Sequence, residues 1–346
     1  MLISRRNLLA MAITWLGFLV ITDASAQGIV AVVDGRAVQS KELDGLLGDK
    51  LVRLKSEEYA VRLTVLNGYV DQILLSREAE RRSISLAELL RQQIDHQVPP
   101  VTEVEARAIL DSSARANEQL VNDATVKAAM EDLKRRRLAK RRGEFLASLR
   151  QQYDAQIKLE APRLSRPITG GHSTGPAEAR VSIVVFSDFQ CPYCSSLDSS
   201  ISRIRQEYGD QLRITAKQFP LPSHRQAGKA AEAALCAAEQ KRYWEMHDML
   251  FSDQRSVALE GFSDLAQRVG LDLQAFESCL TSHKSSAELA RDVVDALSVG
   301  VNSTPTLFIN GLLVLGAKPY EALRGIIDSE IQRTQPNVGA IRSQEQ

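Results

Sequence analysis

A pair of cysteines separated by two residues is the strongest chemical signal in the chain. The segment Cys191-Pro192-Tyr193-Cys194 directly follows residues 181–186, an uninterrupted β-branched and aromatic run typical of a buried central strand. Where that strand gives way to a helix, the first cysteine lies at the helix N-terminus, and the unpaired amide groups and helix dipole there stabilise a thiolate. The second lies one turn inside the helix, close enough to form a disulfide with the first. The spacing predicts a redox pair in which Cys191 is the nucleophile and Cys194 the resolving thiol.

The same spacing can supply half of a zinc site, which needs a second pair of ligands. The other two cysteines, Cys236 and Cys279, are single residues 43 positions apart with no clustered histidine. Redox chemistry is therefore favoured over metal binding. We expect no metal and no cofactor other than the redox-active disulfide Cys191–Cys194.

A second chemical signal is the dipeptide Thr304-Pro305, which directly precedes a β-rich segment. A proline that begins such a strand can be cis, which would place the preceding backbone beside the reactive sulfurs. There it could pair with an extended substrate segment as an added strand. The alternative is an ordinary trans proline. On the first interpretation Thr304 and Pro305, together with Pro192 and Tyr193, form the substrate-binding surface.

The C-terminal half has a pattern of elements that can position these residues. Its order is strand, helix, strand, a long helical stretch, a hairpin and a final helix, which is an α/β layer order. The strands are expected at 181–186, 212–219, 306–309 and 312–315, the helices over about 226–299, and the last helix at 319–332.

The N-terminal half shows a helical pattern without a catalytic constellation. Residues 29–38 form a short hairpin around Asp34-Gly35, and residues 40–152 carry apolar side chains at helical spacing, with a break at Pro99-Pro100. The run 134–142 contains seven basic residues in nine. We interpret it as a solvated helix face rather than an anionic or nucleic-acid contact, because basic and acidic residues balance at 43 each. This half is expected to bind or assemble rather than to catalyse.

The first 26 residues resemble an export signal. Two arginines at positions 5 and 6 precede an uncharged apolar run at 8–21, and Ala24-Ser25-Ala26 fits a signal-peptidase site. The alternatives are an uncleaved anchor and, for the route, either general secretion or twin-arginine export. The expected organisation is a signal peptide at 1–26, a helical domain at 27–161, a linker at 162–176, a second domain at 177–333 and a polar tail at 334–346. We expect the mature protein in the periplasm, an oxidising compartment.

Export also bears on the remaining cysteines. Cys236 and Cys279 are the only cysteines outside the CxxC pair, so we expect them to form a structural disulfide. The alternative is two separate buried cysteines that act as small hydrophobic residues.

Several segments resemble the DsbA-like branch of the thioredoxin superfamily. They are residues 186–194, residues 300–306, Phe219-Pro220-Leu221 with His224, and residues 243–247. The resemblance implies an α/β thioredoxin fold with a DsbA-like helical insertion, preceded by a mainly α-helical N-terminal domain. It also implies a thiol–disulfide oxidoreductase with a cis proline in the substrate groove.

One position departs from that pattern. Many thioredoxin-fold enzymes place a buried carboxylate six residues before the nucleophile, where it assists proton transfer, and here that position is Val185. Asp188, three residues before Cys191, is expected to point elsewhere. The group that handles the proton of Cys194 is left open.

Residues 28–160 resemble the SurA-type N-terminal chaperone domain through the segment 29–35 and the helices after it. The favoured function is an exported enzyme that oxidises or reshuffles cysteines of exported proteins. The alternatives are an isomerase or reductase dimerised by the N-terminal domain, and a chaperone whose main role is client binding. The expected partners are unfolded or cysteine-containing exported proteins, a membrane redox partner and, for the isomerase, a second copy of the chain, but no nucleic acid.

Overall fold

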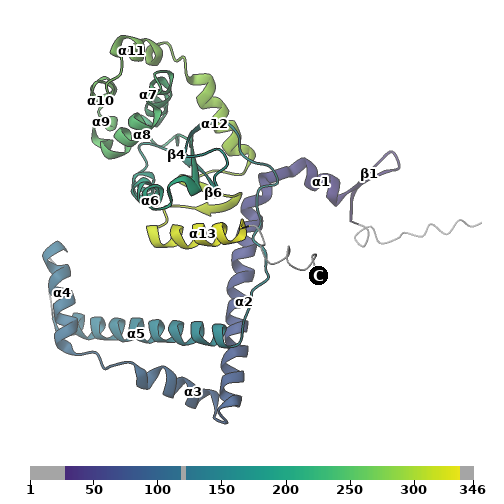
Figure 1. Ribbon diagram of the computed structural model, residues 1–346, viewed down its shortest axis with the longest axis vertical. Helices are drawn as coiled ribbons and strands as arrows, with labels where there is room; N and C mark the ends of the chain where they lie inside the picture. Colours follow the sequence, from purple (N-terminus) through teal and green to yellow (C-terminus); the bar gives the residue numbers. More distant parts are fainter. Residues whose placement is uncertain (1–27, 118–121, 336–346) are drawn as a thin grey trace, which may run out of the picture.

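The computed structural model describes residues 28–117 and 122–335 (Figure 1). The expected signal peptide at 1–26 and most of the expected tail at 334–346 lie outside the described residues. The C-terminal half is an α/β domain, and the N-terminal half is an L-shaped set of helices attached to it by a long helix (Figure 1).

A five-stranded mixed sheet forms the centre of the C-terminal domain. Its order is β3-β5-β4-β6-β7, and only β4 and β5 are parallel, with Val181 opposite Leu212. The central strand β4 is buried, as its β-branched run predicts. The strands are β3 (His172–Thr174), β4 (Val181–Ser187), β5 (Leu212–Gln218), β6 (Thr306–Ile309) and β7 (Leu312–Leu315).

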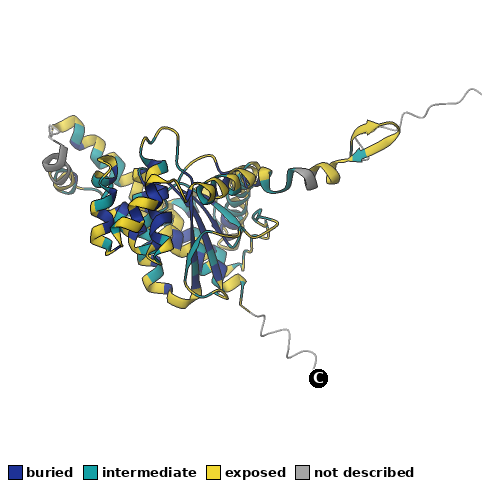
Figure 2. Ribbon diagram, turned by 90° about the horizontal axis from the view of Figure 1, so that it is seen from above, coloured by how far each residue is buried: buried dark blue, intermediate teal, exposed yellow. Residues whose placement is uncertain are grey.

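The alternation of side chains along β4 divides the core into two layers. Ile183 and Val185 pack with α6 (Pro192–Tyr208) and α13 (Tyr320–Arg333) on one face. Val184 and Phe186 pack on the other face with Phe308 of β6 and with Ala296 at the end of α12 (Ser286–Ser298). Figure 2 shows the strands as the buried centre of the molecule.

A helical insertion separates β5 from β6, where the helical stretch was predicted. Its first helix is rich in alanine and almost wholly buried, because small side chains let neighbouring helices approach closely. The predicted pair Cys236 and Cys279 is joined in a disulfide that connects the first helix to the fifth. The helices are α7 (Ala227–Glu239), α8 (Tyr243–Ser252), α9 (Gln254–Ala258), α10 (Phe262–Val269), α11 (Leu273–Thr281) and α12.

The N-terminal half contains the predicted hairpin and helices. Thr102 and Glu105 exchange hydrogen bonds with each other's backbone amides, a capping box that begins the helix after the break at Pro99-Pro100. Its core lies where α2, α3 and α5 meet, around Leu74, Leu89 and Phe145. The elements are β1 (Ile29–Val33), β2 (Arg36–Gln39), α1 (Ser40–Leu47), α2 (Val52–Arg81), α3 (Leu86–Gln93), α4 (Glu103–Asn117) and α5 (Asp123–Gln152).

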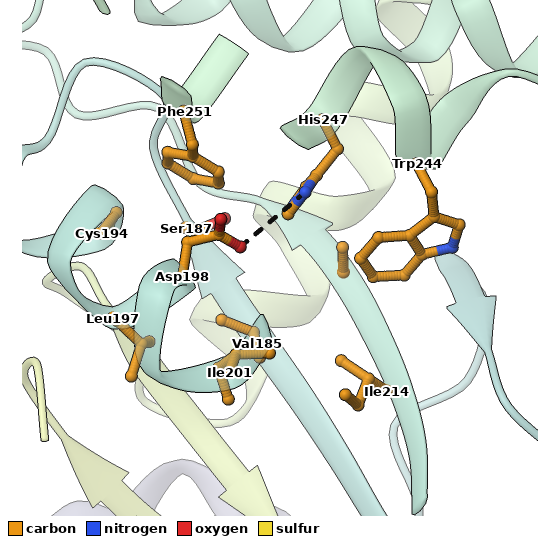
Figure 3. A pocket seen from close by; sticks show the side chains of 11 residues that line it. Val185, Ser187, Cys194, Leu197, Asp198, Ile201, Ile214, Trp244, His247 and Phe251 are labelled. Atoms are coloured by element: carbon orange, nitrogen blue, oxygen red, sulfur yellow. Dashed lines mark ion pairs between the residues drawn. The ribbon is translucent and has the colours of Figure 1, made fainter. Parts of the chain in front are cut away.

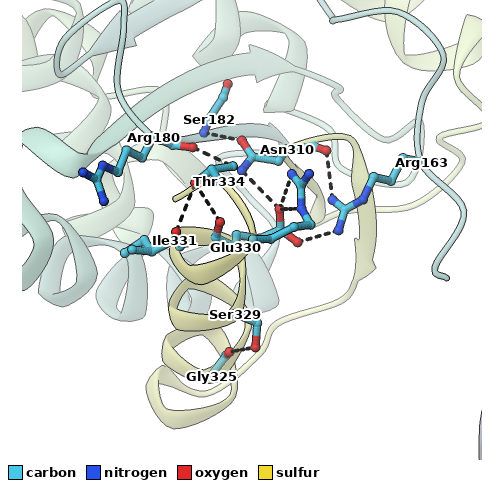
Figure 4. A network of polar contacts seen from close by, with 10 residues as sticks. Arg163, Arg180, Ser182, Asn310, Gly325, Ser329, Glu330, Ile331 and Thr334 are labelled. Atoms are coloured by element: carbon cyan, nitrogen blue, oxygen red, sulfur yellow. Dashed lines mark hydrogen bonds and ion pairs between the residues drawn. The ribbon is translucent and has the colours of Figure 1, made fainter. Parts of the chain in front are cut away.

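The expected linker at 162–176 is wrong in one respect, because the chain there packs against the sheet. Arg163 donates to the carbonyl of Asn310 and to the carboxylate of Glu330 on α13 (Figure 4). Burial opposes ionisation of Glu330, but hydrogen bonds from Arg333, Arg163 and Asn310 outweigh it and lower its pKa. Residues 172–174 add the edge strand β3. Its short polar sequence, His172 to Thr174, carries no strand periodicity, so composition alone indicated a loop.

The first turn of α2 joins the two halves. Val52 is buried in the cluster that contains Phe186 and Phe308, on the sheet of the C-terminal domain. Gly300 has φ +76°, and a Cβ there would lie 3.1 Å from the carbonyl oxygen of Lys50, so the close approach favours glycine. From this junction α2 extends away from the sheet to α3, α4 and α5, whereas α1 and β1 lie beyond its other end (Figure 1).

Candidate active site

The predicted redox pair lies where β4 meets α6. Cys191 is the N-cap residue of α6, and Pro192 occupies the first helical turn, where its missing N–H costs nothing. The amide of Cys191 donates to the carbonyl of Asp188 at 3.1 Å, and the amide of Cys194 donates to the carbonyl of Cys191 at 3.0 Å. The strand-to-helix turn therefore places both cysteines as the sequence predicts.

Both cysteines are unbonded thiols in this structure, and both are buried. The Sγ of Cys191 lies 3.7 Å from the carbonyl oxygen of Thr304, and the Thr304–Pro305 peptide bond is cis. Pro192 and Tyr193 are exposed beside the pair, with 69 % of Tyr193 accessible. The structure thus brings the sequence-predicted substrate-binding residues to the nucleophile.

The two thiols have different surroundings. Burial raises the pKa of the Cys194 thiol well above its usual range, although the backbone amide of Asp188 and the hydroxyl of Thr304 favour the thiolate. Cys194 is therefore a protonated thiol near neutral pH. Cys191 instead caps the N-terminus of α6, where the helix dipole favours negative charge.

Asp188 points away from the sulfurs, as expected. Its carboxylate accepts hydrogen bonds from the amides of Gln190 and Leu221 and lies 2.8 Å from Nδ1 of His224. These contacts fasten the loop before Cys191 to the segment after β5. Asp188 is therefore a fixed support of the active-site loop.

A cavity behind Cys194 contains two ionisable residues that the sequence analysis did not assign. Asp198 on α6 and His247 on α8 face each other across it, with Oδ1 and Nδ1 4.0 Å apart (Figure 3). Val185, the apolar residue at the usual carboxylate position, lines the same cavity. The full lining is Val185, Ser187, Cys194, Leu197, Asp198, Ile201, Ile214, Ala216, Trp244, His247 and Phe251.

Two sequence signals point to these residues in retrospect. Asp198 lies four positions after Cys194, so the two share one face of α6. His247 ends the segment 243–247, which carries part of the family resemblance but had no role assigned. What the sequence lacked was the placement of α8 against α6.

The same cluster has the spacing of metal ligands. Asp198, His247 and Asp248 each offer a ligand atom within 4.8 Å of the others. However, Nδ1 of His247 already lies 3.0 Å from a carboxylate oxygen of Asp248. Arg205 lies 3.7 Å from the second carboxylate oxygen of Asp248, so this carboxylate has two protein partners in place of a cation.

Comparisons with known proteins agree with this fold. A thioredoxin family model matches residues 168–329. The matched relatives include Na(+)/H(+) antiporter NhaA 3 of Salinispora tropica, 36% identical over 159 residues, and Na(+)/H(+) antiporter NhaA of Herminiimonas arsenicoxydans, 29% identical over 163 residues. These alignments include 46% and 47% of this chain but 24% and 26% of the relatives, so the chain spans about a quarter of their length.

Solved structures also match the C-terminal half. A thioredoxin-like oxidoreductase from Silicibacter pomeroyi is 25% identical, with 48% of this chain and 93% of that chain covered and a TM-score of 0.43. Alpha-DsbA1 of Wolbachia pipientis is 21% identical, with 49% and 94% covered and a TM-score of 0.44.

The family model begins at residue 168 and so does not include the N-terminal helices. Their SurA-type resemblance stays a prediction. Across the described residues, no helix combines the length and apolar character that a membrane crossing needs. The sheet order, the cysteine pair at the start of α6 and the family match over residues 168–329 together identify the C-terminal half as a thioredoxin-superfamily domain, with a helical insertion between β5 and β6.

Proposed function

We propose that this chain is a protein thiol–disulfide oxidoreductase that exchanges disulfides with cysteines of exported proteins through Cys191 and Cys194. The observation that carries the proposal is the position of the Cys191 sulfur, which lies at the N-terminus of α6 and 3.7 Å from the carbonyl oxygen of Thr304. A client segment that lies along the backbone of Thr304 as an added strand would bring its own sulfur to Cys191.

The proposed chemistry has two exchanges. In the oxidising direction, a client thiolate attacks Sγ of Cys191 in the Cys191–Cys194 disulfide, and Cys194 leaves. A second client thiolate then attacks the client sulfur of the mixed disulfide, and Cys191 leaves as a thiolate that the helix N-terminus stabilises. In the reducing direction both steps run backwards, and Cys194 resolves the mixed disulfide. The relative stability of the dithiol and disulfide forms sets the direction.

The test uses a chain that begins at residue 28 and a client peptide with two cysteines. Cys191→Ser should abolish exchange, whereas Cys194→Ser should retain the attack and accumulate a mixed disulfide at Cys191, detected by mass spectrometry. The two variants are matched, because each replaces one sulfur of the same pair. Exchange at the wild-type rate by Cys191→Ser would refute the proposal.

We further propose that the N-terminal half binds unfolded clients. Its long helix α2 exposes apolar side chains at Leu54, Val61, Val65 and Tyr69, each more than 60% accessible, although single exposed apolar residues are ordinary. Their recurrence along one helix favours a surface for apolar segments.

A point variant tests this role better than deletion of the whole half, because deletion would remove Val52 from the core of the C-terminal domain. Val65→Asp should leave turnover of a small dithiol unchanged and slow turnover of a reduced, unfolded protein. Equal rates on the unfolded protein would count against client binding at α2. Light scattering on the same samples measures the molar mass, which tests the alternative that a second copy of the chain covers this surface of α2.

We place this activity in the periplasm and expect a membrane redox partner to reset the cysteine pair. The basis is the expected export signal and the fold of the C-terminal domain. Labelling of the free thiols in cells, with and without fractionation, would test both expectations.

A further inference from the structure

We propose that Asp198 and His247 are the proton relay of Cys194, in which Asp198 exchanges a proton with the buried sulfur and His247 passes it to Asp248 at the surface. This inference rests on the proposed function. It answers a need that the active site creates, since Cys194 must gain or lose a proton in every exchange.

The need follows from burial. Cys194 is 1% accessible, and burial raises the pKa of its thiol. Only the thiolate attacks a disulfide, so the sulfur needs a base within the domain. The strand position that carries such a base in many thioredoxin folds is Val185 here, and a valine transfers no proton.

Asp198 is positioned to replace it. The residue lies one turn beyond Cys194 on the same face of α6, and both line one cavity (Figure 3). The cavity offers about 20 Å³ to the centre of a water molecule, which is room for one water as a bridge. Burial raises the pKa of the Asp198 carboxyl, and a carboxyl whose pKa is shifted toward neutrality both takes and gives protons readily.

His247 continues the path outward. Its Nδ1 lies between the two carboxylates, 4.0 Å from Asp198 and 3.0 Å from Asp248. Phe189, Trp244 and Phe251 surround its ring, with centroids 5.6, 4.8 and 5.0 Å away. These contacts fix the direction of the imidazole.

The outer end of the path reaches solvent. The side chain of Asp248 is 50% accessible and lies 3.7 Å from Arg205. Burial is the largest single influence on Asp248 and opposes its ionisation, but the interactions with His247 and Arg205 together outweigh burial and lower the pKa of its carboxyl. The environments of the two carboxyl groups therefore shift their pKa values in opposite directions, an arrangement that assigns them different roles in proton transfer.

The charged groups that face Asp198 come from both packed helices. Burial opposes its ionised form most strongly and Asp248 acts in the same direction, whereas His247 and Arg205 favour the ionised form. The net effect raises the pKa of Asp198, so this carboxyl holds a proton more readily than an exposed aspartate does.

The step balances in both directions. When a client thiolate attacks Cys191, the Cys191–Cys194 bond breaks and its electron pair stays on the sulfur of Cys194. That sulfur takes the proton of Asp198, and the carboxylate left behind recovers a proton from solvent through Asp248 and His247. In the reverse step Asp198 first passes its proton outward through His247 and Asp248 to solvent and then takes the proton of Cys194. The new thiolate attacks Sγ of Cys191, and the client leaves as a thiolate.

The experiment follows a reduced chain that begins at residue 28 as it reacts with an aromatic disulfide that releases one coloured thiolate at each step. The first phase reports the attack by Cys191, and the second reports resolution by Cys194. A metal chelator is present throughout, so that an ion bound to the cluster does not affect the rates. Rates are measured from about pH 5 to about pH 9, the range in which a relay group should titrate.

Asp198→Asn should slow the second phase about 100-fold near neutral pH and leave the first phase unchanged. The remaining rate should rise steadily with pH as hydroxide replaces the relay. His247→Gln should slow the second phase by a smaller factor, and Asp198→Glu should restore part of it. Glu207→Gln is the matched control, because it removes the same charge from α6 at an exposed position outside the cavity.

A second phase with wild-type rate and pH dependence in folded Asp198→Asn would overturn the relay. If that variant does not fold, the carboxyl carbon of Asp198 in the wild-type protein gives the answer by nuclear magnetic resonance. Its titration should differ between the dithiol and disulfide forms, and an identical titration would overturn the proposal. A wild-type protein with no second phase would instead refute the proposed function.

Discussion

Replacing Val52 with alanine should destabilise the C-terminal domain, although Val52 belongs to the helix that carries the N-terminal half. The side chain is 3% accessible and packs in the cluster formed by Phe186, Val299, Val301 and Phe308. The change removes two methyl groups, worth about 1.6 kcal/mol at about 0.8 kcal/mol per buried carbon. The cavity left behind raises the expected cost to about 2–3 kcal/mol.

The fluorescence of Trp244 isolates this effect. The chain has two tryptophans, and a protein that begins at residue 28 retains only Trp244, within the C-terminal domain. In a domain of this size about 1 kcal/mol moves Tm by about 2–4 °C, so Val52→Ala should lower the Trp244 transition by about 4–12 °C. Val61→Ala is the matched control on the same helix, because Val61 is 65% accessible and its transition should move by less than about 2 °C. An unshifted Trp244 transition in Val52→Ala would refute the shared core.

Two further predictions concern stability. Replacing Cys236 and Cys279 with alanine opens a loop whose ends are 43 positions apart and should cost about 4 kcal/mol in chain entropy, measured by urea unfolding without reductant; an unchanged midpoint would contradict this. Hydrogen bonds from Arg81 and Arg82 hold the pKa of buried Glu78 well below its unfolded value of 4.5. Its contribution is therefore present above about pH 4.5 and is lost as pH falls, so the stabilities of wild type and Glu78→Gln should converge in acid. A stability difference that stays constant with pH would show that Glu78 stabilises through packing alone.

Local patterns predicted most of the fold because each element carries its own signal. The buried strand β4 follows from the run at 181–186, and the hairpin of β6 and β7 follows from Asn310-Gly311 between two apolar runs. The cis peptide at Pro305 and the pairing of Cys236 with Cys279 also match the sequence-based expectation. Each of these features depends on residues whose type and spacing can be recognised in the sequence.

The features that sequence reasoning missed depend on contacts between distant elements. The ion pair of Arg163 with Glu330 joins residues 167 positions apart, and neither residue type indicates the other. The burial of Val52 against β4 is similar, because an apolar residue at a helix start has the same pattern whether it faces its own domain or another. Edge strand β3 is too short and polar to show a period of two.

The proposed proton path of Cys194 shows how a domain can lack the usual carboxylate on β4 and still transfer a proton to the buried thiol. Side chains of β4 alternate between faces, and Val185 projects toward α6 into the cavity behind Cys194. A carboxylate at that strand position and a carboxylate one turn after Cys194 on α6 reach the same cavity from opposite walls. The helix position has one advantage, because α8 packs against α6 and brings His247 within 4.0 Å of Asp198. A base on the strand would face only the cavity, whereas Asp198 lies between the sulfur and an imidazole that leads to solvent. A valine at position 185 is therefore compatible with proton transfer to Cys194, because the acid on α6 and the histidine on α8 are both present and face each other.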